Sequence, residues 1–239
     1  MCSGGAVIMK LTLCSMVAAM VIVLSSPAQA VLLKYFEVPV EDATVDSVQS
    51  STNYGSEPTL AIQGYAEFPA IYSLGSVKRI FLKFDLSSIP DDAEIHSARF
   101  GIYFTKGNGG GASTTDPHAA LYLVNDDSWE EMTITWDNMP NPVGGYVDDE
   151  VPLGDTGLYY TWNLLSDLGQ NAWTNYADDL ADNFITFMLV VPDEHLNNFA
   201  IFNSSEAAGN LPYLEIGYVP EPATLMILGI GGLFLVRRR

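Results

Sequence analysis

Acidic side chains are the most abundant groups in this sequence that can do chemistry. Its 239 residues include 29 Asp and Glu but only 10 Lys and Arg, for a formal net charge of −19. Four carboxylates lie around Trp129, namely Asp126, Asp127, Glu130 and Glu131. A glycosidase needs two carboxyl groups about 5 to 10 Å apart, but such pairs arise by chance in a chain this acidic. We therefore interpret the segment as an exposed acidic loop and predict a protein that is not an enzyme.

Other catalytic signatures are weak. The histidines His96, His118 and His195 are scattered along the chain, whereas a histidine-rich transition-metal site needs closer spacing. The sequence has no Gly-x-Ser-x-Gly elbow to support a serine triad. Residues 107–111 (Gly-Asn-Gly-Gly-Gly) lack the Gly-Lys-Ser/Thr of a phosphate-binding loop, which indicates a flexible loop between strands.

The distribution of charge excludes nucleic acid as a ligand and favours calcium as a metal. Residues 31–219 carry 28 acidic side chains and six basic ones, and no basic residue occurs from 107 to 219. Such a surface would repel a phosphate backbone. Calcium suits the composition, because hard carboxylate oxygens are its usual ligands in extracellular domains. The sequence does not contain an Asp-x-Asp-x-Asp-Gly calcium loop.

Aromatic side chains provide a second candidate chemistry. Exposed rings can stack on the C–H faces of sugars while neighbouring polar groups bind the hydroxyls. The candidates are Tyr146, Tyr159, Tyr160 and Trp162, with Asn and Asp nearby. In a strand over 158–163, Tyr160 and Trp162 face opposite to Tyr159, so one set points outward. Core packing is the alternative for each ring, and the acidity of the chain makes neutral polysaccharide an easier ligand than a polyanion.

The candidate acidic and aromatic side chains must be positioned by short segments that are rich in aromatic and β-branched residues. They alternate with clusters of turn residues, which is typical of an all-β sandwich or barrel. Along 80–86 the side chains alternate so that Ile80, Leu82 and Phe84 share one buried face. Candidate strands lie at 33–38, 59–63, 79–85, 95–105, 119–124, 133–136, 158–163, 184–191, 199–203 and 213–218.

One stretch has a helical period instead. Apolar side chains recur every three or four residues at Leu165, Leu168, Ala172, Tyr176 and Leu180. This spacing predicts one amphipathic helix that crosses an end of the sandwich. Ser166 and Asp167 stand where an N-cap is expected.

Residues 1–30 are typical of a secretory signal peptide. Lys10 precedes an apolar run, and Ala28-Gln29-Ala30 forms a cleavage site. A start at Met9 would give a more ordinary signal, because the residues before it add no basic charge. Both cysteines of the chain lie in this segment, so the exported protein is expected to have no disulfide.

The other end of the chain, 220–239, has three parts. They are a turn made by Pro220, Glu221 and Pro222, an apolar run over 223–236, and a basic end made by Arg237, Arg238 and Arg239. The apolar run spans about 21 Å as a helix, against roughly 30 Å of hydrocarbon, which makes it a short transmembrane helix. The arginines favour a cytoplasmic end.

This tripartite pattern resembles the PEP-CTERM sorting signal of Gram-negative bacteria. The resemblance implies export through the secretion machinery and processing by the membrane protease exosortase, commonly in bacteria that make extracellular polysaccharide. The expected location is the cell envelope, the outer surface or the extracellular matrix. A plain C-terminal membrane anchor is the alternative.

Three phrases between the ends resemble the DNRLRE family. The first is Asp-Ala-Thr-Val at 42–45 with Asn-Tyr-Gly at 53–55, the second runs over 79–98, and the third over 128–140. They occur in the family's order over most of 36–218. One departure is Ser204-Ser205-Glu206, where the family typically has Ser-Arg-Glu. The family consists of secreted β-sandwiches, some of which are carbohydrate-binding modules.

The resemblance implies that 31–219 is one domain, a jelly-roll-like antiparallel β-sandwich. Its topology would bring the first and last strands together, which makes Asp42, Asp46 and Glu215 the candidate calcium ligands. Asp46 is alternatively a solvated charge at a sheet edge.

These observations predict a secreted, non-catalytic protein that exosortase sorts and that associates with extracellular polysaccharide. Tyr159, Tyr160, Trp162 and Tyr146 are the candidate sugar-binding residues. One alternative is a structural matrix or surface protein without a specific glycan site, and another is a polysaccharide hydrolase or lyase.

Overall fold

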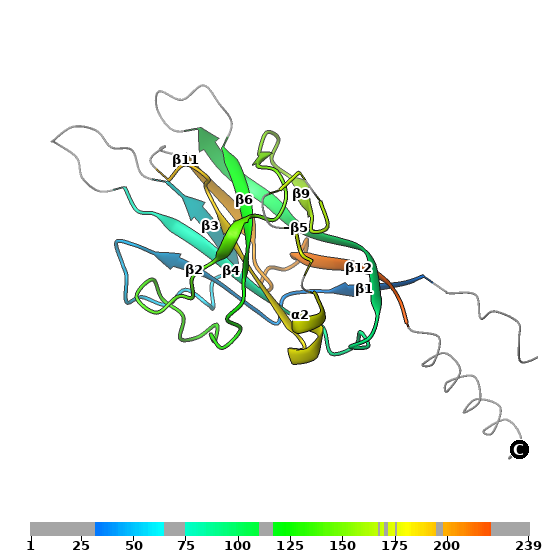
Figure 1. The fold of residues 1–239 in the computed structure, drawn as a ribbon. Coiled ribbons are helices and arrows are strands. Elements are labelled where there is room, and N and C mark those ends of the chain that lie inside the picture. Colours follow the sequence, from blue (N-terminus) through cyan, green and yellow to red (C-terminus); the bar gives the residue numbers. More distant parts are fainter. Residues whose placement is uncertain are drawn as a thin grey trace, which may run out of the picture. The chain divides into compact units, whose positions relative to one another are not determined.

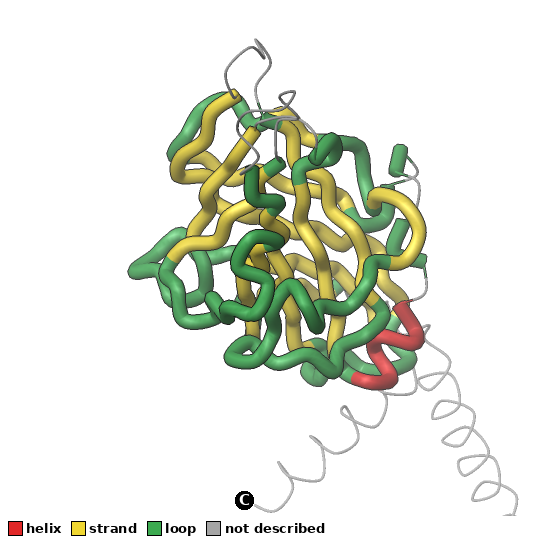
Figure 2. The backbone as a smooth tube through the Cα atoms, turned by 90° about the vertical axis from the view of Figure 1, so that its left-hand side faces the viewer, coloured by secondary structure: helices red, strands yellow, loops and turns green. Residues whose placement is uncertain are grey.

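The structure is a computed structural model that describes residues 32–64, 75–109, 117–166, 168–169, 172–174, 176–194 and 198–220, and nearly all of its regular secondary structure is β-strand. The strands are β1 (Leu33–Glu37), β2 (Glu41–Asp46), β3 (Thr59–Gln63), β4 (Lys78–Asp85), β5 (Glu94–Gly109), β6 (His118–Val124), β7 (Val143–Tyr146), β8 (Val151–Pro152), β9 (Leu158–Asn163), β10 (Phe184–Val190), β11 (Asn198–Asn203) and β12 (Tyr213–Val219). The helix in the described part is α2 (Tyr176–Asp182), which lies at one end of the strands (Figures 1 and 2).

The strands pair in the order β1-β12-β5-β11-β3-β4-β10-β6-β7, with β2 on β4, β8 on β6 and β9 on β5. Every pairing in the described part is antiparallel. The sheet curls, so that aromatic rings from strands that are far apart in the pairing order come close together. The Phe100 ring of β5 lies 6.1 Å from the Phe84 ring of β4 and 5.7 Å from the Phe187 ring of β10. The predicted antiparallel sandwich with one short helix is thereby confirmed.

Alternation along the strands produces two apolar layers. The main core takes the inward side chains of β4, including Ile80, Leu82 and Phe84. Phe81 points to the opposite face and belongs to a second cluster with Trp129 and Met188. The rings of Phe81 and Trp129 lie 6.0 Å apart. Since Trp129 comes from the connection between β6 and β7, this connection covers the outer face of β4 and β10.

One predicted strand is wrong, and three short strands were not predicted. Thr133–Trp136 lies in turns, because the Asn138 side chain accepts a hydrogen bond from the Thr135 N–H (2.7 Å) and donates one to the Thr133 carbonyl (3.0 Å). Strand β2 was not predicted, because half of the residues in its sequence, Glu-Asp-Ala-Thr-Val-Asp, are acidic. The strands β7 and β8 are only four and two residues long.

The helix is shorter than its apolar stripe suggested. Helix α2 begins at Tyr176, and the proposed N-cap Ser166 instead accepts a hydrogen bond from the Leu168 N–H at 3.2 Å. The Trp173 N–H donates to the Leu164 carbonyl at 2.6 Å, and both side chains are buried. Leu164 and Trp173 therefore fill the core from irregular backbone, whereas Leu168 of the predicted stripe is exposed.

The two predicted sorting segments lie outside the described residues, apart from Pro220. Within the described part of the chain, no helix combines the length and the apolar character needed to cross a membrane. The signal peptide and the short transmembrane helix stay predictions.

Candidate functional site

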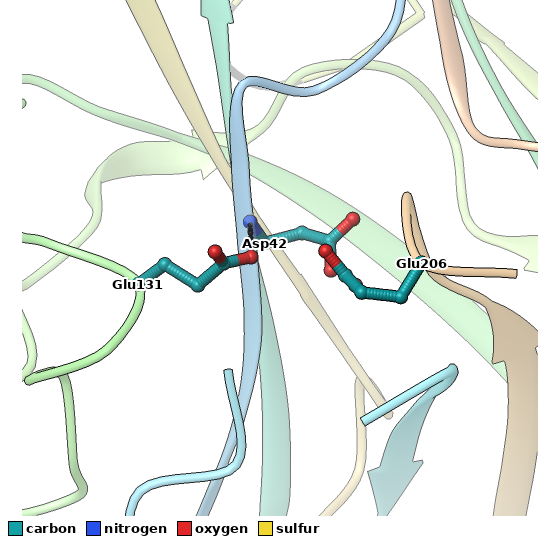
Figure 3. A group of neighbouring side chains, drawn as sticks. All are labelled: Asp42, Glu131 and Glu206. Carbon is teal, nitrogen blue, oxygen red and sulfur yellow. Dashed lines mark hydrogen bonds between the residues drawn. The ribbon is translucent and has the colours of Figure 1, made fainter. Parts of the chain in front are cut away.

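Three carboxylates from distant parts of the chain meet at one place, and we call Asp42, Glu131 and Glu206 the acidic cluster. Each offers an oxygen atom, and these oxygens all lie within 4.8 Å of one another. Figure 3 shows Asp42 between the other two residues, with the side chains of Glu131 and Glu206 pointing toward it from opposite sides. Asp42 belongs to β2, Glu131 to the connection between β6 and β7, and Glu206 to the loop between β11 and β12.

Backbone N–H groups orient two of these carboxylates. The Ser205 N–H donates to Asp42 Oδ2 at 2.7 Å, and the Asp42 N–H donates to Glu131 Oε1 at 3.1 Å. The Ser205 hydroxyl donates to Glu206 Oε1 at 2.9 Å. Asp42 is only 1% exposed, whereas Glu206 lies at the surface. The cluster therefore has one buried carboxylate and one that reaches solvent.

Asn53 holds the backbone at Glu131, and Gly55 leaves room for its close approach. The Asn53 amide donates to the carbonyls of Glu131 (2.6 Å) and Ile134 (2.8 Å), and its oxygen accepts the Gly55 N–H (3.2 Å). A Cβ at position 55 would lie 2.2 Å from the Glu131 carbonyl oxygen, so only glycine fits there. The Asp-Ala-Thr-Val, Asn-Tyr-Gly, Trp-Glu-Glu and Ser-Ser-Glu phrases of the sequence thus converge on one site.

The cluster carries negative charge that no neighbouring base compensates. Burial, opposed by the Ser205 N–H and aided by the charges of Glu206 and Glu131, raises the pKa of Asp42 to about 7. Burial likewise raises the pKa of Glu131. Among the described residues, none of the ion pairs involves a member of the acidic cluster.

The other two predicted calcium ligands lie elsewhere, so the structure does not bring Asp42, Asp46 and Glu215 together. Asp46 ends β2, where it accepts the Val48 N–H (2.9 Å) and the Ser76 hydroxyl and pairs with Lys78 (3.3 Å). Glu215 of β12 pairs with Lys34 of the neighbouring strand β1 at 2.6 Å. Both carboxylates have other partners at these places.

A second feature, which we call the groove, lies over the outer face of β4, β10 and β6. It consists of two adjoining pockets of about 320 and about 270 Å³ that share Val191, Pro192 and Asp193. Arg79, Tyr122 and Glu194 line the larger pocket. His118, Tyr146 and Glu150 line the smaller one.

Aromatic and charged groups lie together in the groove. The Tyr122 and Tyr146 rings meet edge to face at 5.2 Å. Arg79 donates through Nε and Nη2 to Glu194 at 2.8 and 3.1 Å, and its guanidinium lies 4.8 Å from the Trp136 ring. Burial, with Tyr146 alongside, raises the pKa of Tyr122 to about 12, so its hydroxyl keeps its proton at neutral pH.

The predicted sugar-binding residues divide between the groove, the core and another surface. Tyr146 lines the groove. Trp162 is fully buried with its ring 5.7 Å from Phe100, which excludes contact with a glycan in this fold. Tyr160 is half-buried and packs edge to face on Phe104 at 5.8 Å.

Tyr159 points outward and is 40% exposed. Its ring lies 5.2 Å from Tyr103 and 5.4 Å from Tyr213, and Phe36, which is 60% exposed, lies 6.3 Å from Tyr213. We call these four residues the aromatic strip. The strip crosses β9, β5, β12 and β1, which are neighbours in the sheet.

The carboxylates near Trp129 make different contacts. Asp126 accepts the Ser128 N–H at 3.0 Å, and this serine, through its hydroxyl and N–H, lowers the pKa of Asp126. Asp127 accepts the Thr186 hydroxyl, while Glu131 joins the acidic cluster. Asp126 and Glu130 line a small pocket of about 210 Å³. A general acid needs a raised pKa, and Asp126 has the opposite shift.

Sequence reasoning missed Glu206 as a partner of Asp42, and Arg79, Tyr122 and Glu194 as lining of the groove. The Ser-Ser-Glu phrase was visible, but nothing local indicated that it lies beside β2. Arg79 and Tyr122 fall on predicted strands, and only their outward direction separates them from core residues.

Comparisons with known proteins show the family of the domain and of the C-terminal segment. The model of carbohydrate-binding module family 96 matches residues 34–218, and that of the PEP-CTERM protein-sorting motif matches 219–239. A gellan lyase from Bacillus sp is 27% identical over 187 residues, which cover 77% of this chain but only 7% of the lyase. These matches confirm the predicted module-like domain and sorting signal, and the motif indicates export to the cell envelope or extracellular surface.

Proposed function

We propose that this chain, which belongs to carbohydrate-binding module family 96, binds an extracellular polysaccharide in the groove without cleaving it. The observation that carries the proposal is the combination of aromatic rings and charged groups there. Tyr122 and Tyr146 offer ring faces and edges to sugar C–H groups, while Arg79, Glu194 and Asp193 are placed to bind hydroxyls.

Neutral sugar units are the favoured ligand. Glu150, Asp193 and Glu194 line the groove, and the charge of Arg79 is paired with Glu194. A glycan carboxylate would meet this negative surface on a protein of net charge −19. Hydroxyl groups, in contrast, can donate to these carboxylates.

A binding role fits the paired carboxylates better than catalysis does. Asp126 has a lowered pKa, which does not suit a general acid; burial raises the pKa of Asp127, but its carboxylate is engaged by the Thr186 hydroxyl. The resemblance to the gellan lyase covers 7% of that enzyme and does not bring its activity with it.

Exosortase is the proposed processing partner. The motif over 219–239 supports this step, which would follow export from a Gram-negative cell. The module would then lie beside polysaccharide in the envelope or matrix, where a weak binding site is useful.

Replacement of Tyr146 tests the site. The purified protein is applied to the host's exopolysaccharide and to a panel of insoluble neutral and acidic glycans, and retention is measured. Tyr146→Ala should weaken retention about two- to thirteenfold, since an aromatic contact contributes about 0.5–1.5 kcal/mol. The matched control is Tyr159→Ala, an exposed tyrosine on the aromatic strip, and should bind as the parent does.

Other outcomes reject the proposal in distinct ways. Loss of retention in Tyr159→Ala but not in Tyr146→Ala would move the binding site to the aromatic strip. If the parent binds none of the glycans, the protein is a structural matrix component. Release of soluble sugar from the panel would make it a hydrolase or lyase.

A further inference from the structure

We propose that the acidic cluster of Asp42, Glu131 and Glu206 binds one calcium ion that joins three segments of the fold. The site lies on residues that do not line the groove, so this inference is independent of the proposed glycan binding.

A buried oxygen without a partner points to a missing ligand. Asp42 is 1% exposed, and its Oδ2 accepts the Ser205 N–H. Its Oδ1 is buried and, in the described part of the chain, has no hydrogen-bond partner. A buried charged oxygen left in this state costs free energy, and a cation beside it removes the cost.

The spacing of the cluster fits a calcium coordination sphere. Calcium binds oxygen at 2.3–2.6 Å, so two of its ligands lie at most about 5 Å apart. The three ligand oxygens of Asp42, Glu131 and Glu206 lie within 4.8 Å of one another. Calcium also accepts carboxylates in mono- or bidentate form and completes its shell with carbonyl groups and water. Glu206, at the surface, gives an ion a route from solvent.

The cluster is also preorganised. Asn53 holds the Glu131 backbone, Gly55 leaves room for its close approach, and the Ser205 N–H fixes the Asp42 carboxylate. Together these contacts bring three carboxylates close without any base in an ion pair with them among the described residues. An ion there would tie β2 to the β6–β7 connection and to the loop after β11.

Calorimetric titration of calcium into the chelator-treated full chain tests the proposal. One ion should bind per chain, and the midpoint of thermal unfolding should rise with calcium. Glu206→Gln should weaken calcium binding about tenfold or more, because it removes one charged ligand. This surface variant keeps the fold intact, so it remains informative if Asp42→Asn fails to fold. The matched controls are Asp46→Asn and Glu215→Gln, which lose one carboxylate outside the cluster and should bind calcium as the parent does.

Three results would overturn the assignment. The first is no heat of binding and no rise in the unfolding midpoint with calcium. The second is unchanged affinity in Glu206→Gln. The third is weaker binding in a control variant than in Glu206→Gln, which would place the ion at Asp46 or Glu215. Glycan retention by Tyr146→Ala and its parent does not depend on these results, so the two proposals fail separately.

Discussion

Burial of single ionisable groups controls how this fold responds to pH. Asp179 of α2 accepts a hydrogen bond from the indole of Trp173. Burial, opposed by the hydrogen bond from Trp173 and aided by the charges of Asp127, Asp182 and Asp178, raises the pKa of Asp179 to about 6. Since the unfolded carboxyl has a pKa near 3.8, the folded state holds this proton more tightly. Asp179 thus favours the fold at low pH, and that contribution is lost as pH rises through about 6.

Asp179→Asn should remove this loss of stability at higher pH. The amide oxygen can still accept from Trp173 but carries no charge, so the variant should exceed the parent in free energy of unfolding by about 1–2 kcal/mol at pH 8, after allowance for partial exposure. The difference should vanish near pH 4. Urea unfolding followed by Trp fluorescence at several pH values measures it.

The control is Asp91→Asn in an exposed turn, which should change the free energy of unfolding by less than about 0.5 kcal/mol at either pH. A parent that is more stable than Asp179→Asn at pH 8 would show that the carboxylate stabilises α2 in its charged form.

At the scale of elements, the connection between β6 and β7 behaves as a packed layer although it has no regular structure. Lys83 of β4, which is 6% exposed, donates to the carbonyls of Asp127 (3.0 Å) and Trp129 (2.6 Å) and pairs with Glu41 (2.7 Å). The Trp129 indole donates to the Thr186 hydroxyl at 3.1 Å. Side chains of β4 and β10 thus replace the ladder bonds that the connection lacks.

Lys83→Met tests this attachment. The variant leaves two carbonyls and Glu41 without their cation, which should lower the free energy of unfolding by about 2–4 kcal/mol. Amide hydrogen exchange should speed up first over residues 127–139.

Lys34→Met is the matched control, because Lys34 is exposed and has one ion pair, with Glu215. It should cost less than about 1 kcal/mol. Equal losses in the two variants would mean that the buried contacts of Lys83 do not hold the connection.

At the scale of the whole molecule, acidic charge opposes folding. The formal net charge is −19, and the ion pairs in the described part engage only a few of the carboxylates. Repulsion among the others is long-ranged at low salt and is screened within about 10 Å at 0.1 M. The compact state suffers more from this repulsion than the unfolded chain does.

Added NaCl should therefore stabilise the protein. Between 10 mM and 300 mM NaCl, with chelator present, the midpoint of thermal unfolding should rise by about 2–4 °C, equivalent to about 1 kcal/mol for a domain of this size. Differential scanning calorimetry measures the shift. A falling midpoint would show that the attractive ion pairs outweigh the repulsion.

The strands could be predicted because the alternation of side chains that indicates a strand is visible in consecutive residues. Alternation placed Ile80, Leu82 and Phe84 on one face, and the structure buries all three. The turn chemistry of Asn138 overrode the β-like composition of 133–136, and the acidic β2 gave no local signal. The sorting segment could also be recognised, since its turn, apolar run and arginines are contiguous.

Only the tertiary structure decided which groups meet. Alternation placed Tyr159 opposite Trp162, but the curl of the sheet determined that Trp162 faces the core. Asp42 was a candidate ligand from the sequence, yet its partners lie 89 and 164 positions away, at Glu131 and Glu206. Contacts between residues so far apart in the sequence depend on how the strands cross and on the conformation of the irregular loops. Neither can be inferred from the residues that neighbour a side chain in the sequence.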